Sequence, residues 1–191
     1  MSEVSGVILA AGTSSRMGVE NKLMRVWRGK PLVRHVYDAA VASDLAVVVS
    51  VTGHEADLVA SCLPGDAAMT CNGDYANGMA GSIRAGLYRL QGHGPVMILL
   101  GDMPLVTTHH INAMLDAFQA AASDNAIVVA THEGKIGNPV IFGKEHFAAL
   151  KLLEGDRGAG ELVRNSADTL IKVEIGPAAS QDFDTPDAFS N

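Results

Sequence analysis

Residues 7–22 read VILAAGTSSRMGVENK and join an apolar run to a loop of small residues. Val7, Ile8 and Leu9 are β-branched or aliphatic, which predicts a short central strand of a parallel sheet that ends at a tight turn. The loop that follows carries little side-chain bulk and many main-chain N–H groups, and successive N–H groups of this kind form an anion-binding hollow. The stretch therefore predicts a strand with a phosphate-binding loop at its end.

Two cations, Arg16 and Lys22, add full charges to that loop. A guanidinium can hold two phosphate oxygens at once, whereas an ammonium acts as a single mobile charge. The alternative is an ordinary strand–turn–helix junction with two solvated cations, because glycine-containing loops after strands are common in α/β domains. If the segment binds a nucleotide, the residues expected to contact it are Leu9, Ala10, Ala11, Gly12, Thr13, Ser14, Ser15, Arg16 and Lys22.

Two better-known phosphate motifs are absent from the segment. A P-loop ends in Gly-Lys-Ser/Thr, whereas Gly18 is followed by Val19 and Glu20. A dinucleotide fingerprint needs a second glycine two positions after the first, and none follows Gly12 at that spacing. Both differences argue against a P-loop ATPase and an NAD-dependent dehydrogenase.

The composition predicts a soluble globular protein with one domain over 1–191, because 191 residues with 48% hydrophobic content can bury one sizeable core. A net charge of −7 argues against a nucleic-acid partner. No apolar run approaches the roughly 18 residues of a membrane span, and the first residues lack the basic region of a signal peptide. With only two cysteines, no disulfide framework is implied, and a cytoplasmic location is expected.

Strand and helix patterns alternate along the chain, which predicts a doubly wound, mostly parallel α/β sheet with helices on both faces. In such sheets, ligands bind beyond the carboxyl ends of the strands. After the first strand, the others are expected at 45–51, 67–71, 96–100, 126–131, 138–142 and 169–175. The helices are expected at 31–43, 54–63, 80–90, 107–122 and 144–153.

The most hydrophobic strand, VMILL at 96–100, leads directly to Gly101 and Asp102. This order puts the carboxylate of Asp102 at the edge of the sheet where the first loop emerges, so Arg16, Lys22 and Asp102 are predicted to converge there. A carboxylate facing a polyphosphate needs a hard cation between them, and Mg²⁺ typically binds through one or two carboxylates plus substrate phosphates. The alternative is that Asp102 is an N-cap or turn residue.

Six short motifs occur in one order and cover nearly the whole chain: LAAGTSSRMG with Lys22 following, NGMAGS at 77–82, GDMP at 101–104, GNPVIF at 137–142, GDRGA at 155–159 and FDTPD at 183–187. In this order the chain resembles the MocA-like molybdenum cofactor cytidylyltransferases, which belong to the molybdenum cofactor nucleotidyltransferases. That resemblance implies a Rossmann-like sheet of the nucleotide-diphospho-sugar transferase type. Related guanylyltransferases read LAGG where this chain has LAAG, which favours cytidine over guanosine.

The resemblance implies that a phosphate oxygen of molybdopterin attacks the α-phosphorus of CTP and releases pyrophosphate, which yields a cytosine dinucleotide cofactor. Arg16 and the loop amides would hold the departing phosphates, Lys22 would neutralise the α-phosphate, and Mg²⁺ would sit on Asp102. A late carboxylate serves relatives as a second metal ligand, and here Asp184 is the first choice, with Asp182 as its rival. Asp184 could equally cap a terminal helix.

The same resemblance assigns Gly78, Met79 and Ser82 to the pyrimidine and ribose. From the residues alone, Ser82 would be a helix-start residue and Met79 a core side chain. At the acceptor side, the matching positions are Asn138, Pro139 and Arg157.

Two departures from the family pattern leave the acceptor open. Asn138 stands where many relatives have histidine, and Gly160 stands where arginine is common. Arg157 and Arg164 lie near enough in sequence to supply an anion contact instead.

Three functions are therefore compatible with the sequence. The first is the CTP-dependent cytidylyltransferase, with transient contact to a molybdoenzyme or its chaperone. The second keeps the fold and uses GTP, or another phosphorylated acceptor such as a sugar or polyol phosphate. The third is a non-catalytic nucleotide- or pterin-binding accessory protein for a molybdoenzyme.

Overall fold

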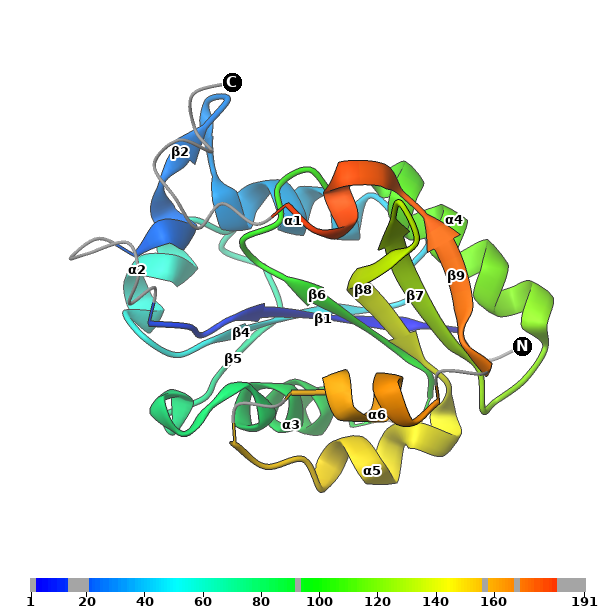
Figure 1. The fold of residues 1–191 in the computed structure, drawn as a ribbon. Coiled ribbons are helices and arrows are strands. Elements are labelled where there is room, and N and C mark those ends of the chain that lie inside the picture. The colour runs from blue at the N-terminus through cyan, green and yellow to red at the C-terminus, as the bar shows by residue number, and fades with distance from the viewer. Residues whose placement is uncertain (1–2, 14–20, 92–93, 156–157, 167–168, 182–191) are drawn as a thin grey trace.

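The strand that the sequence places first, β1 (Ser5–Ala10), lies in the middle of a seven-stranded sheet of order β5-β4-β1-β6-β8-β7-β9 (Figure 1). The structure is a computed structural model that describes residues 3–13, 21–91, 94–155, 158–166 and 169–181. All seven predicted strands are confirmed, with bounds β4 Val48–Thr52, β5 Met69–Cys71, β6 Val96–Leu100, β7 Ile127–His132, β8 Lys135–Phe142 and β9 Ile171–Glu174.

The sheet is mostly parallel, as predicted, with β8 reversed. β1 pairs in parallel with both β4 and β6, β4 with β5, and β7 with β9, whereas β8 is antiparallel to β6 and β7. The reversal follows from the two-residue link between β7 and β8, because a parallel pair needs a much longer crossover. That link is Glu133 and Gly134, whose φ values of 49° and 77° are those of a tight hairpin turn.

Helices cover both faces of the sheet, in agreement with the predicted fold class (Figure 1). One face carries α1 (Leu32–Val41) and α4 (Thr108–Ala121), and the other carries α3 (Met79–Leu90), α5 (Phe147–Lys151) and α6 (Gly160–Asn165). A short helix, α2 (Ala56–Ser61), follows β4. The sides of β1 alternate, because Val7 and Leu9 join the core under α3 whereas Ile8 joins the core under α1 and α4.

Several short elements were not predicted. A hairpin of two-residue strands, β2 (Val26–Trp27) and β3 (Lys30–Pro31), precedes α1, and α6 was not expected as a helix. Single 3-10 turns connect other elements, namely η1 (Lys22–Met24), η2 (Tyr75–Asn77), η3 (Lys144–His146) and η6 (Gly176–Ala179). Within the described ranges, no helix combines the length and the apolar character that a membrane crossing requires.

Two polar arrangements fix the helices of the α1 and α4 face. On α1, Asp38 accepts hydrogen bonds of 2.6 Å from both Lys30 and Arg34. Burial alone would raise the pKa of Asp38, but these two cations outweigh it and hold that pKa below its ordinary value. At the start of α4, the side chain of Thr107 accepts from the His110 N–H, and the Thr107 N–H donates to His110 Nδ1. Burial, followed by repulsion from the adjacent histidine, lowers the pKa of His110.

Candidate active site

The carboxyl edge of the sheet brings Lys22 and Asp102 together. Lys22 Nζ lies 2.6 Å from Asp102 Oδ2, and the two side chains are 15% and 17% exposed. Eighty residues separate them in the chain, and the rule that adjacent parallel strands end at one edge predicted their meeting. The convergence of these two groups is therefore confirmed, whereas their chemical roles stay predictions.

The local geometry on each side of this contact holds it in place. Asn21 is buried, and its side chain accepts a 3.1 Å hydrogen bond from the Leu23 N–H, which starts the turn η1 that carries Lys22. On the other side, the Gly101 N–H donates to the Leu9 carbonyl at 2.9 Å and continues the ladder between β1 and β6. A side chain at 101 would place its Cβ 3.1 Å from that carbonyl oxygen, so glycine allows the close approach. Asp102 consequently leaves the sheet right beside the end of β1.

The donor chemistry of this edge fits a hard divalent cation that shares its shell with phosphates. Asp102 offers carboxylate oxygens, and nowhere in the part of the chain that the structure describes do three or more His, Cys, Asp or Glu side chains gather into a metal-binding group. A cation here would take few ligands from the described residues, which is the usual mode of Mg²⁺ in nucleotide sites. Other predicted members of the site lie outside the described residues, namely Ser14, Ser15, Arg16, Asp182 and Asp184.

The predicted base and ribose residues lie at the start of α3. Gly78 is buried, has a φ of 105°, and precedes the first residue of the helix. Ser82 is also buried, and its hydroxyl accepts a 3.1 Å hydrogen bond from Asn72 Nδ2, which ties the helix to the segment after β5. Met79 is 42% exposed and lines a pocket, so the interpretation of Met79 as a core side chain is wrong.

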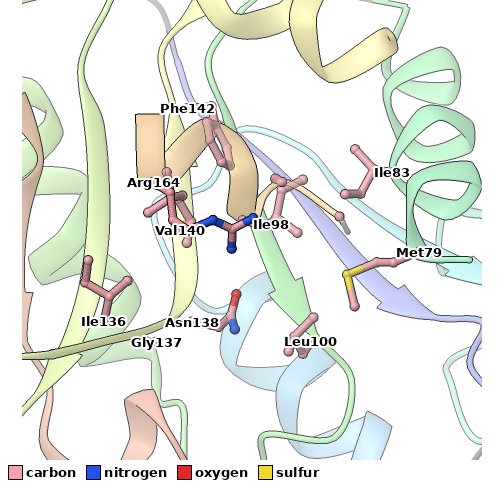
Figure 2. A pocket seen from close by; sticks show the side chains of 14 residues that line it. Met79, Ile83, Ile98, Leu100, Ile136, Gly137, Asn138, Val140, Phe142 and Arg164 are labelled. Atoms are coloured by element: carbon pink, nitrogen blue, oxygen red, sulfur yellow. The ribbon is translucent and has the colours of Figure 1, made fainter. Parts of the chain in front are cut away.

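A pocket of about 510 Å³ opens between α3, β6, β8 and α6 (Figure 2). Its volume falls in the range of small-molecule sites, roughly 300–1,000 Å³. Apolar side chains form most of its wall, among them Met79, Ile83, Ile98, Leu100, Val140 and Phe142. Leu100 stands two positions before Asp102, so the pocket borders the charged edge of the sheet.

The pocket lies where β6 and β8 stop pairing, before β6 ends. The pairs between them run from Val96 with Phe142 to Ile98 with Val140 and go no further. The next residue of β8 is Pro139, which has no N–H to donate to a ladder. The register of β7 with β8 also shifts in this region, between Val129 and Thr131. The end of β6 is thus left without a paired strand on that side.

The predicted acceptor residues have separate outcomes. Asn138 lines the pocket, whereas Pro139 is buried where the pairing with β6 stops and is not one of the lining residues. Arg157 lies outside the described residues. Arg164 lines the pocket from α6, and Figure 2 shows its guanidinium pointing into it. In the sequence, Arg164 was noted only because it lies near Gly160. The four-residue spacing between them puts both on one helix face, which would have indicated that Arg164 shares the pocket with Gly160.

A doubly wound sheet with a lysine–carboxylate pair at its carboxyl edge and a pocket beside it has the layout in which open α/β sheets bind their ligands. Comparison with known families makes the assignment specific. The chain belongs to the family described as the MobA-like NTP transferase domain, whose model matches residues 6–170. It is therefore a member of a nucleotidyltransferase family.

Solved structures share the fold over nearly the whole chain. The crystal structure of Rv0371c from Mycobacterium tuberculosis H37Rv superposes with a TM-score of 0.83 at 23% identity, covering 99% of this chain and 96% of that one. A second Rv0371c structure contains manganese and superposes with a TM-score of 0.80 at 24% identity, covering 98% of this chain and 96% of that one. A CMP:2-keto-3-deoxy-manno-octonic acid synthetase complexed with CTP superposes with a TM-score of 0.78 at 13% identity, covering 99% and 96%. At these identities the likeness establishes the fold.

Among curated proteins, the bifunctional protein GlmU of Brevibacillus brevis is 27% identical over 184 residues. The match covers 95% of this chain and 35% of GlmU. The chain thus spans about a third of the length of this relative.

Proposed function

We propose that this protein transfers CMP from CTP to the phosphate of a molybdopterin-type acceptor and releases pyrophosphate. The observation that carries the proposal is the 2.6 Å contact of Lys22 with Asp102 at the sheet edge, next to a largely apolar pocket that begins at Leu100. One place suits a metal-bound polyphosphate, and the other suits a flat organic acceptor. The fold also holds CTP in a synthetase of similar structure, which supports the choice of nucleotide.

In the proposed reaction, a phosphate oxygen of the acceptor forms a bond to the α-phosphorus of CTP as the bond to the bridging oxygen of pyrophosphate breaks. The attacking phosphate is already ionised, so no side chain has to remove a proton. The ammonium of Lys22 would neutralise the α-phosphate, and Arg16 with the amides of the loop after β1 would hold the departing phosphates. The residues therefore act by position and charge.

Asp102 would hold a divalent cation, with Asp184 or its rival Asp182 as a second ligand. When bound, Mg²⁺ supplies charge neutralisation between the carboxylates and the phosphates. In the absence of nucleotide, Lys22 provides the neutralising charge on Asp102.

The pocket would then receive the acceptor beside the nucleotide. The side-chain amide of Asn138 offers both a donor and an acceptor, as the polar edge of a pterin ring requires. The apolar walls on β6 and α3 suit the faces of such a ring. Met79 lines this pocket from the start of α3, so the proposed base and ribose contacts of Gly78, Met79 and Ser82 would adjoin the acceptor.

The test is a comparison of the four ribonucleoside triphosphates on the full chain. With Mg²⁺ present, CTP should raise the melting temperature most, because a ligand that binds only the native state stabilises it. Adding molybdopterin should then release pyrophosphate and give a product with the mass of the cytosine dinucleotide. Asp102→Asn serves as the inactive control. A larger shift with GTP, release only with a sugar or polyol phosphate, or binding without turnover would each overturn the proposal.

A further inference from the structure

We propose that Arg164 selects the acceptor by binding an acidic group on it, so that the pocket takes a flat, largely apolar molecule that carries a negative charge. The proposal rests on the proposed function, because it concerns the acceptor side of the same site. It assigns to the acceptor an acidic group in the pocket beside Arg164, which the transfer reaction alone does not require there.

The first observation is the charge of the pocket. Among the described residues that line it, Arg164 carries the only formal charge, and the rest are apolar side chains, glycines and Asn138. Figure 2 shows the guanidinium reaching from α6 into the space bounded by β8 and β6. Arg164 is an exposed residue, so an anionic ligand that enters the pocket can reach its guanidinium directly.

The second observation is that Arg164 has no counter-charge in the described ranges. No hydrogen bond or ion pair joins it to another described residue. By contrast, Arg34 on α1 is paired with Asp38 at 2.6 Å. All N–H groups of the Arg164 head are thus available to a ligand from within the described structure, and the fork shape of guanidinium matches carboxylate and phosphate groups.

The third observation is the residue one turn earlier, Gly160. A Cβ built at 160 would lie 3.5 Å from Arg164 Nη1, in ordinary van der Waals contact, so a side chain longer than that of alanine would compete with the guanidinium for space. Gly160 is not among the residues with positive φ, and its backbone therefore does not require glycine. The missing side chain clears the position of the arginine head. Together, these observations identify Arg164 as a group that can bind an anion in the pocket, at a position that Gly160 leaves open.

The experiment uses two fluorescent probes with one ring system, pterin-6-carboxylate and 6-hydroxymethylpterin. They differ in whether the substituent at one ring position is charged. Binding to the full chain is followed by quenching of pterin fluorescence. The wild type should bind the carboxylate about 10- to 100-fold more tightly, as expected for a charge-assisted hydrogen bond.

Arg164→Gln should reduce that preference to less than about threefold, and Arg164→Lys should keep part of it as a point charge. Arg89→Gln is the matched control, because Arg89 is an exposed arginine of α3 that does not line the pocket. A preference that survives Arg164→Gln, or a wild type that binds neither probe or both equally, would overturn the inference.

A second variant tests position without removing the charge. Gly160→Leu should displace the guanidinium and abolish the preference, although Arg164 is still present. Circular dichroism establishes that each variant is folded, and retention of the preference in folded Gly160→Leu would count against the inference. The CTP-induced shift in melting temperature separates the two proposals. A wild type that shows no shift with CTP refutes the cytidylyltransferase. A wild type that shows the shift but does not prefer the carboxylate probe refutes only the role of Arg164.

Discussion

A double-mutant cycle on Lys22 and Asp102 measures the coupling free energy of their contact and so tests whether the two charges stabilise the fold together. At 2.6 Å and an effective dielectric constant of about 20, the attraction between the two charges is about 6 kcal/mol before desolvation. Both side chains are more than four-fifths buried, so desolvation offsets most of that attraction. The coupling free energy should be about 2 kcal/mol. This value lies between the one for exposed pairs, below about 1 kcal/mol, and the cost of breaking a buried pair, about 3–5 kcal/mol.

The assay is urea denaturation of the wild type, Lys22→Met, Asp102→Asn and the double variant without nucleotide. Each single change should lower the free energy of unfolding by about 2 kcal/mol or more, whereas the double variant should lose less than the sum of the two. Single losses that add to within about 0.5 kcal/mol would refute the reasoning, because they would mean that the two charges do not interact in solution.

The same variants separate stability from function. With CTP and Mg²⁺ at about 100 times their dissociation constant, the wild type should gain about 2.7 kcal/mol. Asp102→Asn should lose the part of this gain that depends on the metal, and Lys22→Met should lose part of the gain from the nucleotide. An unchanged metal-dependent gain in Asp102→Asn would remove Asp102 from the proposed metal site.

Three further predictions concern the fold. Gly86→Ala should lower the free energy of unfolding by about 1–3 kcal/mol in a urea titration, because the added methyl would lie 2.5 Å from a Val7 methyl; an unchanged midpoint would contradict this packing. The depressed pKa of Asp38 stabilises the fold above the unfolded pKa of 3.8, and this stability is lost as the pH falls through the lower folded pKa. Asp38→Asn should therefore lose less stability than the wild type on acidification. An equal loss of stability in the two proteins would speak against the ion pairs. Because the folded pKa of His110 is lowered, its contribution to stability is present above the unfolded pKa of 6.5 and is lost as the pH falls below that value. Acidification from about pH 7 to 5 should thus destabilise the wild type more than His110→Gln, which keeps a capping side chain that does not titrate. A larger loss of stability in His110→Gln would exclude this cap as the cause.

The sequence predicted the elements whose pattern is long or strongly apolar. The run VMILL matches the bounds of β6, and the helix predicted at 31–43 contains α1. The meeting of Lys22 with Asp102 was also predictable, because it needs only the order of the strands and the rule for their carboxyl ends.

The features that the sequence did not predict depend on contacts rather than on local pattern. α6 has six residues and begins at Gly160, so neither its length nor its propensity distinguishes it from a loop. The strands of the hairpin before α1 have two residues each, too few to show an alternation. The direction of Arg164 into the pocket depends on how α6 packs against the sheet, and this packing brings together segments that lie far apart in the chain.

The early end of the pairing between β6 and β8 leaves one strand with two kinds of pocket residue, those that also pair with β6 and those that do not. Residues 140–142 pair with β6, and Val140 and Phe142 among them also line the pocket, so substitutions there carry a cost in folding. Ile136 and Asn138 line the pocket and lie outside the ladder with β6, so their side chains can differ without loss of that pairing. Gly137 between them is constrained, because a Cβ there would overlap the backbone carbonyl of Ala179. Substitutions at these two positions of β8 would therefore reshape the proposed acceptor pocket without a new fold and without change at the nucleotide edge.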